Sequence, residues 1–224
     1  MSRLVSRWPG NLAFLEWPRV GSGNLGSQAP LDRVKRYDFL AAFNRGFAAA
    51  QQQAERHSSD LERQEKWGSY CAEMAVWHLL FGDLEQAAIQ AEKARAMWEY
   101  LGRAAPTNLF CHAQLERAYV VLGVSRLLNG QAQAAMKSAR EGLKLNAAMT
   151  ECKAILALGL AFDGQYEKAS EILLQNRAHK VGQNQIFPEA VLNDLRRFRD
   201  NGLMQLDPGK LEKLLAAALP QTSK

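Results

Sequence analysis

A short pattern that recurs three times along the chain constrains its fold more than any other feature. Glycine is followed after four residues by alanine at Gly82–Ala87, Gly130–Ala135 and Gly164–Ala169, and an apolar stretch precedes each glycine. A glycine at a helix end adopts a backbone conformation that a Cβ atom would disfavour. The alanine five residues later lets a second helix pack closely against the first. The pattern therefore predicts three turns, each between two packed helices.

Helical periodicity extends from Asp32 nearly to the C-terminus, because apolar residues recur at steps of three and four. Ser59 or Asp60 is a candidate N-cap, Gly102 a candidate helix end, and Pro188 a candidate first-turn residue. Helices are predicted at 32–56, 60–82, 83–101, 107–129, 188–200 and 208–219, with two shorter pairs between them that break near Asn146 and Gly164. Residues 180–187 are predicted to be a loop. No segment alternates convincingly with a period of two, so we expect an all-α fold of about nine helices.

The first 31 residues have a different composition from the rest. They contain three prolines and four glycines, which indicates a loop-rich leader. We expect five of its apolar side chains to dock on the helical part: Trp8, Leu12, Phe14, Leu15 and Trp17. Residues 1–36 carry six basic and two acidic side chains, and an organelle transit peptide is one alternative interpretation.

The three turns also share small residues in the helix before each glycine. Seven positions before the glycines stand Ala75, Gly123 and Ala157, and Gly130 and Gly164 are 34 residues apart. In these respects the chain resembles the tetratricopeptide repeat family, whose 34-residue unit consists of two antiparallel helices. Gly82 and Gly130 are 48 residues apart, and we assign the excess of 14 to a longer second helix and loop at 96–109. The family's usual Trp, Tyr and closing Pro are absent from their positions.

The resemblance implies a right-handed array of antiparallel helix pairs. We expect a leader at 1–31 and a single helical-repeat domain at 32–224, with repeat units at about 68–101, 116–149 and 150–179. Helices at 33–56 and 188–219 are expected to cap the array, because terminal repeats must present a polar outer face.

In this family one set of first-helix positions lines a concave face that binds peptides, and nine of the twelve matching positions here are apolar. The clamp of Lys, Asn and Arg with which one branch binds chaperone C-termini is absent. The resemblance thus implies a non-catalytic adaptor or chaperone-like scaffold that binds another protein. The residues expected to contact the partner are Val76, Leu79, Val120, Val124, Leu127 and Leu158, with Arg117 and Arg126 expected to orient it.

The sequence leaves open what covers this apolar stripe. Residues 119–128 and 154–162 are apolar nearly all round, which indicates burial on every side. There are three alternatives. The chain covers the stripe itself, through the leader or the 188–219 helices; a second copy covers it in a homodimer; or a partner covers it with an amphipathic helix or an apolar segment. The first alternative would move any binding function to another surface.

Sequence motifs for catalysis or cofactor binding are not convincing. Gly21–Gly26 matches G-x-G-x-x-G, but Pro18 interrupts the strand that a dinucleotide site needs, and a flexible linker explains the glycines. Cys71, His78, Cys111 and His112 lack the short, paired spacing of a zinc site. We therefore expect no cofactor, no metal and no enzyme activity. A divergent helical-repeat enzyme, whose residues converge only in the fold, is an alternative.

A second alternative is a regulatory protein that associates with nucleic acid. Arg196, Arg197 and Arg199 lie beside Phe198, and with Lys180 and the basic leader they are candidates for a phosphate-binding surface. No nucleic-acid-binding motif accompanies them, and Asp194 and Asp200 flank the cluster. A solvated helix face with local ion pairs is the simpler interpretation.

Charge and cysteine content indicate the compartment. The chain has 28 basic and 23 acidic side chains, three widely spaced cysteines and no run of 18 apolar residues. An odd number of unclustered thiols favours a reducing, cytoplasmic location, and the absence of such a run predicts no membrane-spanning helix. Residues 8–11 break the apolar N-terminal stretch, which argues against a secretory signal.

Overall fold

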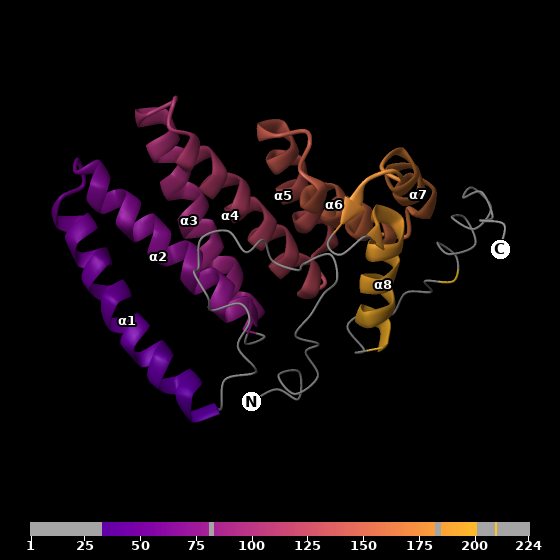
Figure 1. Ribbon diagram of the computed structural model, residues 1–224. Coiled ribbons are helices and arrows are strands. Elements are labelled where there is room, and N and C mark those ends of the chain that lie inside the picture. Colours follow the sequence, from indigo (N-terminus) through magenta and orange to yellow (C-terminus); the bar gives the residue numbers. More distant parts are fainter. Residues whose placement is uncertain (1–32, 81–82, 182–184, 201–208, 210–224) are drawn as a thin grey trace.

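The chain folds into a series of helices that turn back on one another in sequence order (Figure 1). The computed structural model describes residues 33–80, 83–181, 185–200 and 209. The elements are α1 (Arg33–Arg56), α2 (Leu61–Leu80), α3 (Leu84–Ala104), α4 (Leu109–Leu128), α5 (Ala132–Leu145), α6 (Thr150–Phe162), α7 (Tyr166–Gln175), β1 (Lys180–Val181), β2 (Gln185–Ile186) and α8 (Phe187–Asp200). The prediction of an all-α fold is confirmed, with eight helices in the described part of the chain.

Each helix packs against the next one along the chain, from α1 through to α7 (Figure 1). Contacts also join α2 to α4 and α4 to α6, so these three helices form one row, which we call the α2–α4–α6 row. Helices α3 and α5 pack beside this row, and α8 contacts α6 and α7 at the far end. The result is an array of antiparallel helix pairs.

Two of the three turn glycines have the conformation that their sequence pattern predicts, and Gly82 lies outside the described residues. Gly130 and Gly164 have φ angles of 74° and 76°, in the left-handed region that favours glycine. The three alanines that follow the turns are fully buried at the start of α3, α5 and α7. Gly123 is as close-packed as expected, because a Cβ built on it would lie 2.9 Å from a methyl carbon of Ile155 on α6. Small residues thus allow neighbouring helices to approach closely.

Helix starts agree well with the sequence, but one helix end does not. The Asp60 carboxylate accepts a hydrogen bond from the backbone N–H of Arg63 at 3.2 Å, so Asp60 caps α2. The prediction that Gly102 ends a helix is wrong, because α3 continues through it to Ala104. The helix stops at Ala105, whose backbone leaves the helical region with φ −135° and ψ 74°, because Pro106 disfavours a helical residue before it. The next helix starts at Leu109, capped by Asn108, rather than at Thr107.

The segment predicted as a loop at 180–187 contains a small antiparallel ladder. Lys180 pairs with Ile186, and Val181 pairs with Gln185. The prediction is therefore wrong for these residues, since two residues per strand are too few to show an alternating pattern. The first-turn prediction for Pro188 is confirmed, because α8 begins at Phe187.

Two groups of buried side chains hold the helices together. The main core extends from Ala75 on α2 to Leu192 on α8. The second core lies between α2, α3 and α4 and consists of Cys71, Ala72, Ala94, Trp98, Leu101, Cys111, Leu115, Ala118 and Tyr119. The expectation of a longer second helix in the first unit is confirmed, because α3 has 21 residues whereas α5 has 14. Trp98 and Leu101 belong to this added length and help to build the second core.

Some expectations fall on residues that the structure does not describe. The leader at 1–31, with its expected docking, and the predicted helix at 208–219, apart from residue 209, lie outside the described residues. At the other end of the array, Gln52, Gln53, Glu55 and Arg56 of α1 are exposed. Among the helices that the structure describes, none combines the length and apolar character needed to span a membrane.

Candidate protein-binding surfaces

The eight residues expected to contact a partner lie on the α2–α4–α6 row. Val76 and Leu79 are on α2, Leu158 is on α6, and the other five are on α4. All six of the apolar residues belong to the main core, so the structure does bring them into one cluster.

These apolar residues are buried rather than open to a partner. Val124 is only 2% exposed, and the other five are also buried. Every residue of α4 from Ala118 to Ser125 is buried, which is more than two helical turns and hence all sides of the helix. Phe187, Ala190 and Val191 of α8 belong to the same core. The row is therefore part of the interior, and over the described part of the chain it does not form the open groove that the resemblance implied.

The two arginines expected to orient a partner are bound to other helices of the chain. Arg117 Nη1 donates to Glu73 Oε1 on α2 at 3.0 Å. Arg126 Nη1 donates to Ser138 Oγ on α5 at 2.6 Å, and its Nη2 lies 3.3 Å from Glu92 Oε2 on α3. Arg126 therefore faces α3 and α5, and it does not join the apolar residues of the row. Both side chains connect helices.

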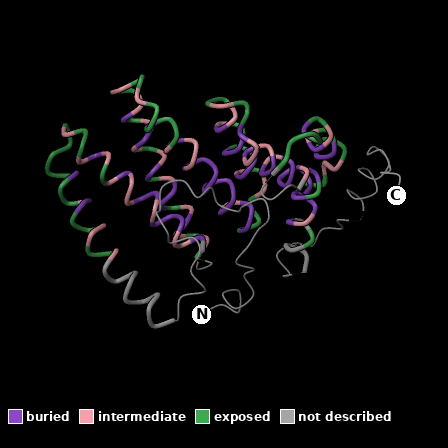
Figure 2. The backbone as a smooth tube through the Cα atoms, viewed as in Figure 1, coloured by how far each residue is buried: buried purple, intermediate pink, exposed green. Residues whose placement is uncertain are grey.

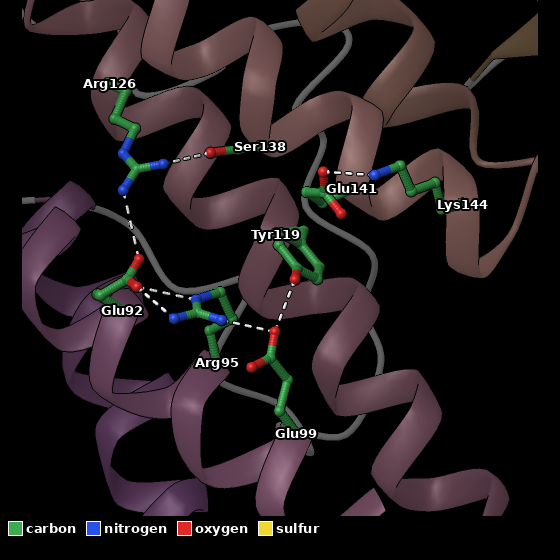
Figure 3. A network of polar contacts seen from close by, with 8 residues as sticks. All are labelled: Glu92, Arg95, Glu99, Tyr119, Arg126, Ser138, Glu141 and Lys144. Atoms are coloured by element: carbon green, nitrogen blue, oxygen red, sulfur yellow. Dashed lines mark hydrogen bonds and ion pairs between the residues drawn. The ribbon is translucent and has the colours of Figure 1, made fainter.

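Arg126 is one end of a polar network that joins α3, α4 and α5 (Figure 3). Arg95 binds both Glu92 and Glu99 on its own helix, and the hydroxyl of Tyr119 donates to Glu99 Oε1 at 2.8 Å. Burial, together with the hydrogen bond to Glu99, raises the pKa of Tyr119 to about 12. Burial alone would raise the pKa of Glu99, but the hydrogen bonds from Tyr119 and Arg95 outweigh it and lower that pKa. Each charge is met by a partner within the network, which suits a structural role.

The three thiols are buried at separate places in the two cores. Desolvation raises the pKa of Cys71 and of Cys152 to about 12, and it also raises the pKa of Cys111. Over the described residues, no three potential metal ligands come together. His78 Nδ1 lies instead 3.3 Å from Asp83 Oδ2, close to the start of α3. The cysteines thus act as small apolar fillers of the helix packing.

An exposed apolar surface does occur, at the junction of α3 and α4. We call residues 100–113 the α3–α4 tip. Leu109 is 81% exposed, Phe110 46% and Tyr100 40%, and Ala104, Pro106 and Ala113 are also exposed. Large apolar side chains grouped in this way on a surface commonly mark an interaction site.

Hydrogen bonds and ring packing hold the backbone of the tip in a defined shape. The side-chain oxygen of Asn108 accepts from the N–H groups of Phe110 and Cys111, at 3.0 and 3.4 Å. The ring of Phe110 meets the buried ring of Trp98 edge-on, with centroids 5.6 Å apart. His112 Nε2 lies 2.9 Å from the carbonyl oxygen of Pro106. The exposed side chains therefore project from an ordered turn on the second core.

Two more exposed apolar residues lie on the same edge of the array. Leu61 begins α2 and Leu145 ends α5, and both are exposed. Because consecutive helices are antiparallel, these ends fall on the edge that carries the α3–α4 tip, at the top of Figure 1. Figure 2 shows exposed residues at these hairpin ends and buried residues toward the middle of the array. Five of the six large apolar residues exposed in the described part of the chain lie on this edge.

Sequence reasoning did not find this surface. It assigned 96–109 to extra helix and loop without asking what that length would expose. A signal was available, because Leu109 and Phe110 come three and four residues after the break at Pro106, and no acidic residue occurs between Tyr100 and Leu115. Whether an apolar side chain at a helix start is buried depends, however, on which neighbours reach it.

The basic cluster on α8 is only partly described. Arg196 is exposed and donates to Asn193 on the same helix, at 3.0 Å. Asp194, expected to form ion pairs on a solvated face, is instead buried. The side chains of Arg197 and Arg199 lie outside the described part of the structure.

A depression of about 450 Å³ lies between α1 and α2, lined by Gly46, Ala49, Ala50, Gln53, Asp60, Glu62, Arg63, Lys66 and Tyr70. Arg63 crosses it, with Nε 2.8 Å from Asp60 Oδ2 and Nη1 2.8 Å from Gln53 Oε1. The contact with Gln53 joins α2 to α1, and none of the lining residues points to a particular ligand.

Comparisons of the chain with family models, curated proteins and solved structures return no match. The function proposed below therefore depends on the residues of this chain and on the resemblance of its repeats.

Proposed function

We propose that the protein is a non-catalytic protein–protein interaction module, an adaptor or scaffold that holds another protein in the cytoplasm. The observation that carries this proposal is the gathering of exposed apolar side chains along one edge of the helix array. Such side chains are stabilised when a partner removes them from water. The resemblance to tetratricopeptide repeats supports the same class of function, because stacked helix pairs provide extended binding surfaces.

The binding surface in this proposal differs from the one implied by the resemblance. The α2–α4–α6 row is buried, so it contributes the rigid frame of the module. The ion pair of Arg117 with Glu73 and the contacts of Arg126 with Glu92 and Ser138 reinforce that frame. In this proposal the exposed hairpin ends contact the partner.

Affinity capture from a lysate of cells that make the protein tests this function. The tagged full-length chain and a tagged Ile89→Ser variant are compared by mass spectrometry with the tag alone. Ile89 is 40% exposed and begins the second turn of α3, away from the tip, so its replacement serves as a surface control. We expect both proteins to retain the same partner at defined stoichiometry. Capture of nothing beyond the tag control would overturn the proposal.

A further inference from the structure

We propose that the α3–α4 tip is a docking site for a short apolar segment of a partner protein that carries acidic residues beside its apolar anchors. This inference rests on the proposed function and names the surface and the partner chemistry. The anchors would pack against Leu109 and Phe110, and the acidic flank would lie near Arg103.

The size of the surface favours a short segment. Large side chains have areas of roughly 200 Å² each, so the exposed fractions of Leu109 and Phe110 amount to about 250 Å². A stable protein dimer buries about 800 Å² on each partner. The tip alone is therefore too small for a stable contact with a second copy, but it is large enough to hold two or three apolar side chains of a peptide.

The charge of the tip favours an acidic flank. Between Tyr100 and Leu115 the chain contains Arg103 and His112 and no carboxylate, and Arg103 is exposed. Glu99, at the base of the tip, is hydrogen-bonded to Arg95 and Tyr119, and the charge of Arg103 also acts on it and helps to lower its pKa. The charge of Glu65 on α2 is directed at buried Cys111. Desolvation is the main reason why the pKa of Cys111 is raised, and Glu65 adds to it. The exposed part of the tip thus offers a positive charge beside an apolar surface, which selects against basic segments.

The tip is also ordered before binding. Asn108 caps α4, and Phe110 rests on Trp98, which is fully buried in the second core. A segment that docks there does not have to order the receiving backbone, so less of the binding free energy is lost.

Selection from a library of random peptides displayed on phage tests the proposal with a defined probe. The full-length protein is immobilised, and enriched peptides are synthesised and titrated by fluorescence anisotropy. We expect the enriched peptides to combine aromatic or leucine residues with Asp or Glu. We expect Leu109→Ser with Phe110→Ser to weaken their binding by about tenfold or more. Arg103→Glu should weaken acidic peptides by about threefold to tenfold, and Ile89→Ser should bind as the wild type does.

The single variant Leu109→Ser distinguishes a loss of peptide binding from a loss of folding. Leu109 is 81% exposed at the start of α4, so its replacement leaves both cores intact. Its thermal unfolding should match that of the wild type, while peptide binding is reduced.

Three outcomes would overturn the inference. One is that no peptide is enriched, and another is that enriched peptides bind the Leu109 and Phe110 variants as they bind the wild type. The third is concentration-dependent self-association, abolished by Leu109→Ser, which would make a second copy the occupant. If the wild type and Leu109→Ser capture the same lysate partner equally well, the α3–α4 tip is not the docking site, but the proposed function still holds. If the wild type captures nothing from the lysate, the proposed function itself fails.

Discussion

Replacing Trp98 tests whether the second core supports the α3–α4 tip. Its side chain is fully buried among residues of α2, α3 and α4, and it meets the ring of Phe110 edge-on. Removal of the ring leaves a cavity that the surrounding helices fill only in part. We therefore expect Trp98→Ala to lower the free energy of unfolding by about 3–5 kcal/mol.

The expected cost of Trp98→Phe is much smaller. The loss of ring area costs about 1–2 kcal/mol. In compensation, the change removes the indole N–H, which is buried and finds no acceptor among the described residues. A buried donor without a partner costs about 1–3 kcal/mol. The two contributions nearly cancel, so Trp98→Phe should stay within about 1 kcal/mol of the wild type.

Urea unfolding followed by far-ultraviolet circular dichroism measures both effects, provided that the variants show equal dependence on urea. Trp98→Phe acts as the matched control for Trp98→Ala. Both changes remove the indole N–H, but Trp98→Phe keeps an aromatic ring in the core and Trp98→Ala does not. The reasoning is refuted if Trp98→Phe destabilises as strongly as Trp98→Ala. It is refuted equally if Trp98→Ala costs less than about 1 kcal/mol, since a core ring cannot be removed so cheaply.

Three further predictions concern buried groups. Val124→Glu places a carboxylate in the main core, so we expect loss of helical circular dichroism, whereas Leu145→Glu on the exposed edge should retain it. Because the pKa of Tyr119 is raised to about 12 from its ordinary value of 10, the folded state retains this proton more tightly than the unfolded state. The resulting stability is complete below pH 10 and should be lost as the pH rises toward 12; urea midpoints should show a shallower loss in Tyr119→Phe, and equal slopes would contradict the assignment. Cys71 and Cys152, with pKa values of about 12, should resist a thiol-specific disulfide reagent at neutral pH until the protein unfolds, and rapid labelling of the folded protein would show that they are accessible.

Local sequence signals predicted the helix pairs because their physics is local. The turn glycines at 130 and 164 have the positive φ that the pattern requires, and Asp60 caps α2 through its own carboxylate. The failure at Gly102 has a local reason as well. A glycine permits a helix to end but does not force it, and the actual stop is set by Pro106.

The candidate binding surface could not be predicted in the same way. Val120, Val124 and Leu127 have the spacing of one helix face, but spacing does not distinguish a face that meets a partner from one that meets the chain's own core. Arg126 illustrates the same limit, because its partners Glu92 and Ser138 are 34 and 12 residues away in the sequence. Only the packing of α3 and α5 against α4 brings these side chains within hydrogen-bonding distance.

The sequence by itself determined that the chain forms helices, where most of them begin and end, and that small residues let them pair. These properties depend on backbone conformation and on residues within a few positions of one another. The tertiary structure alone decided which apolar residues are interior and which are exposed. Val124 and Leu109 are both apolar residues of α4, yet one is 2% exposed and the other 81%. The difference arises because exposure depends on neighbours that are distant in the sequence, and at the α3–α4 tip the helices extend to a point where few neighbours cover them.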